Sequence, residues 1–124
     1  MSFLNKIFGN REEQNPEITF WNYIESEENL YKAKEESFKK KVVIFKHSTR
    51  CYISKIVLKK FEKQVGNSDK EVGYYFLDLL AHRNLSNKIA VDFGVEHQSP
   101  QLIILENGKA VKNASHQSIS LSLV

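Results

Sequence analysis

The chain has 124 residues, of which 41% are hydrophobic and 27% are charged, so it is long enough for one compact domain with a real core and too short for two. Its formal net charge of +3 is too small for the basic stripe of a nucleic-acid-binding protein, and we expect no nucleic-acid partner. No stretch approaches the roughly 18 apolar residues of a membrane span, so we expect no membrane-spanning segment.

Residues 1–17 are expected to form an N-terminal tail or a short docking helix, and residues 18–124 the folded domain. Apolar side chains at Phe3, Leu4 and Ile7 would share one face of such a helix. The segment lacks the longer apolar run and the small-residue cleavage site of a signal peptide. We therefore expect a cytoplasmic protein.

Strands and helices are predicted to alternate along the domain. Residues 18–24 are rich in aromatic side chains and predict a strand, or a strand leading into a helix. Residues 27–38 have the apolar spacing of an amphipathic helix, and the apolar run within 41–45 is typical of a strand buried on both faces. A polar turn over 47–50 comes next. Apolar side chains then recur at helical spacing from residue 53 to a stop at 66–67.

The second half of the domain continues this alternation. Residues 73–80 predict a buried strand, 85–93 a helix and 102–105 a third apolar strand. The Asn-Gly pair at 107–108 suits a tight hairpin turn of a primed type, with a returning strand over 110–113 and a short helical or irregular segment from Ser118. This order predicts an α/β fold in which helices cover both faces of parallel strands and the hairpin adds an antiparallel edge.

Cys51 is the only cysteine, and it lies where the buried strand passes into the next helix. The N–H groups and the dipole of a helix N-terminus favour a thiolate there, and the neighbouring Arg50 and His47 could add positive potential. A lone cysteine is most often a small buried hydrophobe, but its place in a polar turn favours a reactive nucleophile. Any disulfide must form with another molecule, because the chain has no second cysteine.

Pro100 is a second candidate functional residue. It leads directly into the predicted strand from Gln101, where a missing N–H is tolerated. Its peptide bond could be cis, as in a tight functional turn, or it could be an ordinary trans turn proline.

Cys51 and Pro100, in this order of elements, resemble the two halves of a thioredoxin active site, in which the cysteine opens a helix and a cis-proline loop faces it. The resemblance covers residues 18–115. It implies a thioredoxin-like α/β fold with a central mixed sheet of four to five strands, flanked by helices on both faces. Cys51-Tyr52-Ile53-Ser54 stands where thioredoxins have Cys-x-x-Cys, so Ser54 takes the place of the resolving cysteine and the site has one thiol.

Four segments narrow the resemblance to the monothiol bacilliredoxins, the small thioredoxin-like proteins of the bacillithiol system. The matching segments, in the same order, are 45–54, 85–87, 97–101 and 113–116. Two positions differ from the usual pattern, because Tyr52 stands in place of a proline and Gln117 in place of an aromatic residue.

The resemblance implies a thiol-disulfide oxidoreductase that removes bacillithiol, or a similar small thiol, from mixed disulfides on proteins. Cys51 would be the nucleophile, and Ser54 could only hydrogen-bond the thiolate because a hydroxyl forms no disulfide. The main chain of Ser99 would pair with the substrate backbone. Bacillithiol would be a co-substrate, with no tightly bound cofactor and no metal. The expected partners are S-thiolated client proteins and a small-molecule thiol, and the chain is expected to be a monomer.

Further side chains complete the expected site. Arg50 and Lys46 could bind the carboxylates of the bacillithiol malate group, or could lie in solvent. His47 and His116 could support the site, or could be capping or core-edge residues. The residues expected to contact the substrate are Thr49, Arg50, Tyr52, Ser99 and Pro100.

Two other classes of function stay open. Monothiol proteins of this fold can bind an iron–sulfur cluster through one cysteine from each protomer and small thiols. A redox-silent binding module could also keep the fold without the chemistry. No structural zinc site is expected, because the sequence has no His and Cys cluster at ligand spacing.

Overall fold

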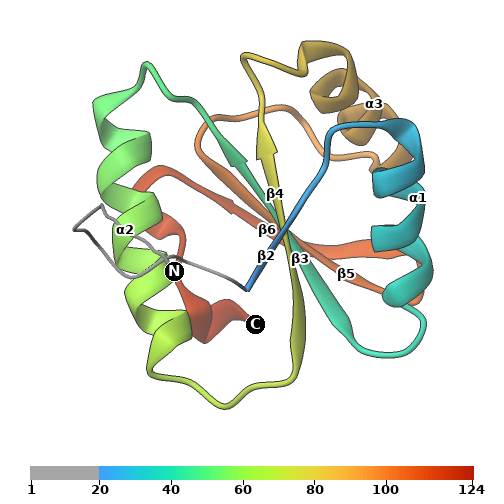
Figure 1. The fold of residues 1–124 in the computed structure, drawn as a ribbon, viewed down its shortest axis with the longest axis horizontal. Coiled ribbons are helices and arrows are strands. Elements are labelled where there is room, and N and C mark those ends of the chain that lie inside the picture. The colour runs from blue at the N-terminus through green and yellow to red at the C-terminus, as the bar shows by residue number, and fades with distance from the viewer. Residues whose placement is uncertain (1–19) are drawn as a thin grey trace, which may run out of the picture.

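The computed structural model describes residues 20–124. The segment expected to form a tail or docking helix, 1–17, lies outside this part of the chain, as do the first two residues of the domain expected over 18–124. The elements in chain order are β2 (Trp21–Tyr23), α1 (Glu27–Glu36), β3 (Lys41–His47), α2 (Tyr52–Gly66), β4 (Val72–Asp78), α3 (Arg83–Phe93), β5 (Gln101–Glu106), β6 (Lys109–Ser115), η1 (His116–Ser118) and η2 (Leu121–Leu123) (Figure 1).

The strands form one five-stranded mixed sheet in the order β2-β4-β3-β5-β6. Strands β2, β4 and β3 run parallel, whereas β5 is antiparallel to β3 and β6 is antiparallel to β5. The central strand β3 is paired on both sides, with Val43 opposite Tyr74 of β4 and Ile104 of β5. The predicted mixed sheet with an antiparallel hairpin at its edge is therefore confirmed.

Helices cover both faces of the sheet, as predicted (Figure 1). Successive side chains of a strand point to opposite faces, so Val42 and Ile44 of β3 face α1 and α3, whereas Val43 and Phe45 face α2. Both faces are therefore apolar, which explains the uninterrupted apolar run in this strand. The α2 side is completed by the C-terminal segment, which buries Ile119 and Leu121.

The turn between β5 and β6 has the predicted primed geometry. Asn107 and Gly108 both have positive φ angles, of 54° and 76°. The positive φ favours glycine at position 108, and a Cβ atom there would also lie 2.7 Å from the ring of Phe38, which would have to shift. Ser37 fixes the turn, because its carbonyl accepts from the Asn107 N–H at 2.8 Å and its hydroxyl from the Gly108 N–H at 2.8 Å.

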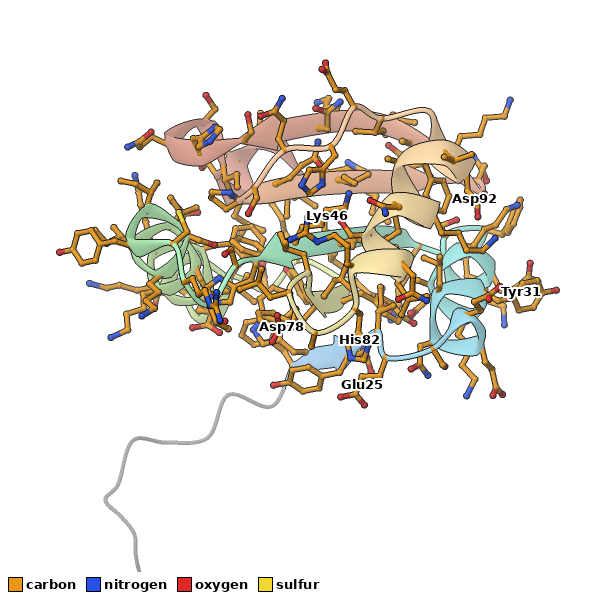
Figure 2. The ribbon with its side chains drawn as sticks, turned by 90° about the horizontal axis from the view of Figure 1, so that it is seen from above. Glu25, Tyr31, Lys46, Asp78, His82 and Asp92 are labelled. Carbon is orange, nitrogen blue, oxygen red and sulfur yellow. The ribbon has the colours of Figure 1, made fainter. Side chains whose placement is uncertain are left out.

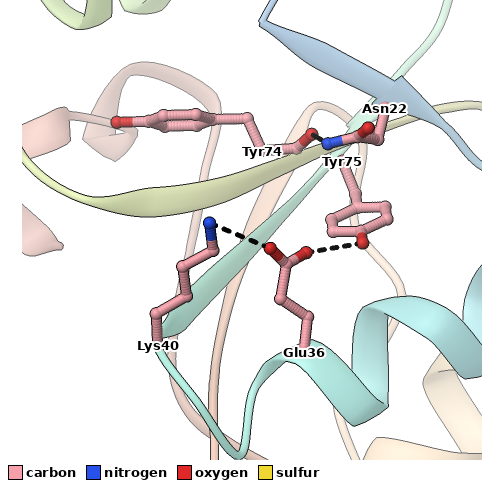
Figure 3. A network of polar contacts seen from close by, with 5 residues as sticks. All are labelled: Asn22, Glu36, Lys40, Tyr74 and Tyr75. Atoms are coloured by element: carbon pink, nitrogen blue, oxygen red, sulfur yellow. Dashed lines mark hydrogen bonds and ion pairs between the residues drawn. The ribbon is translucent and has the colours of Figure 1, made fainter.

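A polar network connects α1 to the sheet (Figure 3). The Tyr75 hydroxyl donates to Glu36 at 2.6 Å, and Lys40 lies 3.0 Å from the other carboxylate oxygen. Burial raises the pKa of Tyr75, and the Glu36 carboxylate raises it further. Burial opposes ionisation of Glu36, but the Tyr75 hydrogen bond and Lys40 outweigh it and lower the Glu36 pKa. Nearby, the Asn22 side chain donates to the Tyr74 carbonyl at 3.1 Å and secures the short strand β2.

Several predicted boundaries differ from the observed ones. Strand β3 continues through His47, which was assigned to the turn, and β6 covers 109–115 rather than 110–113. Helix α1 ends two residues earlier than predicted, and the segment from Ser118 forms short 3₁₀ turns. Within residues 20–124, none of the helices combines the length and the apolar character needed to cross a membrane.

Candidate functional site

Cys51 is the N-cap residue of α2, with an extended backbone (φ −98°, ψ 119°). Its carbonyl accepts the first helical hydrogen bond, from Lys55 N–H at 3.1 Å, and its own N–H donates to the Ser48 carbonyl at 3.2 Å. The side chain makes no capping hydrogen bond, and the residue is partly exposed. The backbone therefore holds this partly exposed cysteine at the positive end of the helix dipole.

The hydrogen-bond partners of the Ser54 hydroxyl are Ser48 and His47, not the cysteine that it was expected to bond. Its fully buried hydroxyl accepts the Ser48 N–H at 3.1 Å and lies 2.8 Å from Nδ1 of His47. The hydroxyl donates to Nδ1 or accepts from it according to the tautomer of the ring, since a hydroxyl oxygen has one proton and two lone pairs. Within residues 20–124, the structure contains no hydrogen bond between Ser54 and Cys51. Ser54 instead fixes the turn that carries the cysteine.

His47 lies at the buried end of β3 rather than in the polar turn. Burial lowers its pKa, an effect that Asp78 partly opposes and Lys55 reinforces. The ring is therefore neutral at neutral pH and does not supply the positive potential that the sequence suggested. The difference arises because the strand is longer than predicted, which places the ring inside the sheet instead of in solvent.

The residues on either side of Cys51 are exposed. Thr49 and Arg50 form the surface of the turn before it, and Tyr52 directly after it is 75% exposed. Within the described part of the chain, Arg50 forms no ion pair. These three side chains are therefore placed where a bound substrate could reach them.

The Ser99–Pro100 peptide bond is cis. Lys46, near the end of β3, pairs with Gln101 at the start of the antiparallel strand β5. The turn before Cys51 and the Ser99–Pro100 loop therefore lie at the same end of two neighbouring strands. Pro100 is buried, and its carbonyl accepts the His116 N–H at 3.1 Å. The His116 side chain itself is exposed, so this residue supports the loop through its backbone.

Ser99 has a buried hydroxyl oxygen with no hydrogen-bond partner among residues 20–124. Buried polar atoms without a partner are uncommon in folded proteins.

Lys46 is the main residue whose role the sequence did not reveal (Figure 2). It is fully buried, whereas we expected it to bind substrate carboxylates or lie in solvent. Its Nζ donates to the Ser86 carbonyl at 3.1 Å and lies 3.4 Å from Nδ1 of His97, which is also 3.3 Å from the Ser86 hydroxyl. Burial lowers the Lys46 pKa to about 8. The signal that could have located it is its period-two spacing from Val42 and Ile44 on the same face of β3.

The loop before Pro100 is also held from β5. The buried Gln101 side chain donates to the Glu96 carbonyl at 2.9 Å and accepts the Gln98 N–H at 3.3 Å. Burial lowers the pKa of His97, as do the nearby cations Lys46 and Arg83, so its neutral ring can accept from Lys46. Two strands thus fix the loop that lies beside the cysteine turn.

No metal centre is apparent in this part of the molecule. Among residues 20–124, no three His, Cys, Asp or Glu side chains are arranged so that they could hold a metal ion.

Comparisons with known proteins agree with this geometry. The family model for monothiol bacilliredoxin BrxC matches residues 22–124. A solved structure with a thioredoxin fold is 32% identical, with a TM-score of 0.73 over 83% of this chain and 88% of the other. Thioredoxins from Malassezia sympodialis and Nicotiana alata are each 18% identical with TM-scores of 0.65, over 86% and 84% of this chain and 87% of each of theirs. The two thioredoxins show likeness of fold alone.

Proposed function

The chain belongs to the monothiol bacilliredoxin family, a family of redox thiol proteins with a thioredoxin-like fold, and from this premise we propose that it removes bacillithiol, or a similar small thiol, from mixed disulfides on client proteins. The reaction centre is Cys51, the only thiol that the chain possesses. Bacillithiol is a substrate in this reaction and not a resident cofactor.

The reaction is a thiol-disulfide exchange in which no net oxidation occurs. The Cys51 thiolate attacks the bacillithiol sulfur of the mixed disulfide, so a new S–S bond forms to Cys51 as the bond to the client breaks. The client cysteine leaves as a thiolate and takes a proton from solvent. A second thiolate, from a small molecule or another protein, then attacks the bacillithiol sulfur of the Cys51 adduct, so a disulfide forms between that thiol and bacillithiol and Cys51 leaves as the thiolate.

The observation that carries the proposal is the difference in exposure and hydrogen bonding between Cys51 and Ser54, the two positions that are cysteines in thioredoxins. Cys51 is partly exposed at the start of α2, whereas Ser54 is fully buried and its hydroxyl is engaged by Ser48 and His47. The adduct cannot be resolved within the chain, and it must wait for an external thiol. A one-thiol site of this kind suits removal of a small cap from a client.

The Ser99–Pro100 loop supports binding of the client backbone. The main chain of Ser99 would pair with the client as an added strand, a mode that uses backbone groups and tolerates many sequences. Thr49, Arg50 and Tyr52 would contact the substrate from the other side of the sulfur. Direct binding of the cap by Lys46 is not part of the proposal, because that side chain is fully buried.

The proposal is tested with a client protein whose single cysteine is capped by bacillithiol. We expect the wild-type chain to release the free client and to gain the mass of one small thiol, located on Cys51 by peptide mass spectrometry. Cys51→Ser should abolish both events, whereas the matched exposed substitution Ser118→Ala should preserve them. Release of the cap by the Cys51→Ser chain would contradict the proposal.

A further inference from the structure

Beside Cys51, the outer surface of α2 contains an apolar pair that the chain leaves uncovered. Tyr52 is 75% exposed and Ile56, one helical turn later, is 48% exposed. They line a groove of about 420 Å³, which we call the α2 groove. Its lining residues are Tyr52, Lys55, Ile56, Leu58, Lys59 and Glu62. Large exposed apolar side chains grouped beside a reactive centre are typical of an interaction surface.

The charges around the α2 groove are mostly positive. Lys55 and Lys59 line it, Arg50 lies two residues before its first lining residue, and none of the three forms an ion pair with another residue in the described range 20–124. The groove has one carboxylate, Glu62, and this group accepts the indole N–H of Trp21 at 2.8 Å. Two lysines thus share the groove with one carboxylate that already has a partner.

The start of α2 adds to this positive potential. The first turn of α1 contains two acidic side chains, Glu27 and Glu28, which complement the positive end of its dipole. The first turn of α2 contains none. The surface that begins at Cys51 therefore favours a negatively charged partner.

The dimensions of the α2 groove suit a short peptide segment. It runs from residue 52 to residue 62, which at a helical rise of 1.5 Å per residue corresponds to about 15 Å. An extended chain covers that length with about four or five residues. One end of the groove is lined by Tyr52, which directly follows Cys51 in the chain.

We propose that the α2 groove docks the segment of a client protein next to its capped cysteine, and that this segment combines an apolar side chain with acidic residues. The inference rests on the proposed function and names the class of client. The apolar side chain would pack against Tyr52 and Ile56. The acidic residues would pair with Lys55, Lys59 and Arg50, which would raise the association rate and select among capped proteins.

The test uses matched peptides that carry one bacillithiol-capped cysteine. The first has a leucine and two aspartates on each side of the cysteine, the second has lysines in place of the aspartates, and the third has serine in place of leucine. We expect the highest kcat/KM for the first peptide. Removal of either the acidic or the apolar feature should lower it by about tenfold.

Two neighbouring lysines provide matched variants. Lys59 lines the groove and Lys60, the next residue of α2, is exposed but does not line it. Lys59→Glu should lower kcat/KM for the acidic peptide about tenfold and raise it for the basic peptide, whereas Lys60→Glu should change both by less than about twofold. Equal effects of the two substitutions would overturn the proposal, because only net charge would then matter.

Docking is separated from chemistry by a binding measurement. Fluorescently labelled peptides with alanine in place of cysteine should bind the full chain carrying Cys51→Ser, and Lys59→Glu in that chain should weaken binding of the acidic peptide alone. If exchange fails while this preference persists, the proposed function is wrong and the docking surface stands. If exchange succeeds without any preference for the acidic apolar peptide, or if single-stranded DNA competes as well as that peptide, the docking proposal is wrong.

Discussion

The ammonium group of Lys46 lies 3.4 Å from Nδ1 of His97, so the strand that leads to Cys51 is connected directly to the loop that contains Ser99 and Pro100. The lysine is fully buried, and among residues 20–124 no carboxylate forms an ion pair with it. The two backbone segments of the candidate site are therefore joined by a single desolvated charge and two neutral acceptors, the Ser86 carbonyl and the His97 ring.

Replacement of His97 tests this connection. His97→Phe removes an acceptor from the buried ammonium group and should lower the free energy of unfolding by about 1–3 kcal/mol. His97→Asn places an amide oxygen near the position of Nδ1 and should recover most of that loss. Urea unfolding followed by tryptophan fluorescence measures both values. Equal destabilisation by the two substitutions would show that the hydrogen bond to Lys46 contributes nothing.

The Lys46 pKa of about 8 predicts how stability depends on pH. An unfolded lysine titrates near 10.4, so between these values the folded chain releases its proton first. The unfolded state then binds more protons, and the free energy of unfolding should rise with pH, by about 1–2 kcal/mol between pH 7.5 and 9.5. The contribution of Lys46 to the free energy of unfolding is complete at a pH above its pKa in the unfolded chain. It is lost as the pH falls through its pKa in the folded chain.

A matched pair of variants isolates this effect. Lys46→Met should remove the rise, because methionine fills a similar volume and does not titrate. Lys60→Met, at an exposed position of α2, should retain it. Denaturant unfolding at the two pH values gives the four numbers needed. A rise of the same size in the Lys46→Met chain would assign the pH dependence to other groups.

Ser54→Ala should affect stability more than thiol reactivity. The substitution leaves the Ser48 N–H and Nδ1 of His47 without their partner, which should lower the free energy of unfolding by about 1–3 kcal/mol. The midpoint of the pH profile for iodoacetamide alkylation of Cys51 should stay at its wild-type value, because the Ser54 hydroxyl bonds to Ser48 and His47 and makes no hydrogen bond to the sulfur. Ser118→Ala is the control. A shift of the midpoint in Ser54→Ala but not in Ser118→Ala would show that the Ser54 hydroxyl acts directly on the Cys51 thiol.

Two glycines provide a matched comparison of backbone effects. Gly108→Ala introduces a side chain at a φ angle of 76° and within 2.7 Å of Phe38, so it should destabilise the chain by about 1–2 kcal/mol or more. Gly66→Ala, at the end of α2, meets no atom within 4 Å and should be neutral or slightly stabilising. Thermal unfolding of both variants measures the difference. A larger loss in Gly66→Ala would contradict this account.

The features that the sequence predicted well depend on local chemistry. The primed turn at Asn107-Gly108 follows from two residues that accept positive φ angles, and the buried character of β3 follows from four consecutive apolar side chains. Cys51 could be placed at a helix start for the same reason, because a polar turn lies between an apolar run and a helical spacing. Each of these inferences uses only neighbours in the chain.

The features that were missed depend on contacts between distant segments. Ser86 of α3 and His97 lie 40 and 51 residues after Lys46 in the chain. The interior position of Lys46 is apparent only when these two residues are placed against β3. The neutral state of His47 depends on its burial in the sheet, which a chain-order assignment to a turn could not reveal. A polar side chain near the end of a strand gives no local signal of its solvent exposure.

The engaged hydroxyl of Ser54 limits how readily a two-cysteine enzyme could arise from this chain. A thiol is a weaker donor and acceptor than a hydroxyl, so cysteine at this position would leave the Ser48 N–H and Nδ1 of His47 poorly satisfied inside the fold. Acquiring an internal resolving thiol would therefore require a compensating change at His47 as well as at residue 54. The contacts around residue 54 therefore suit an oxygen atom better than a sulfur atom.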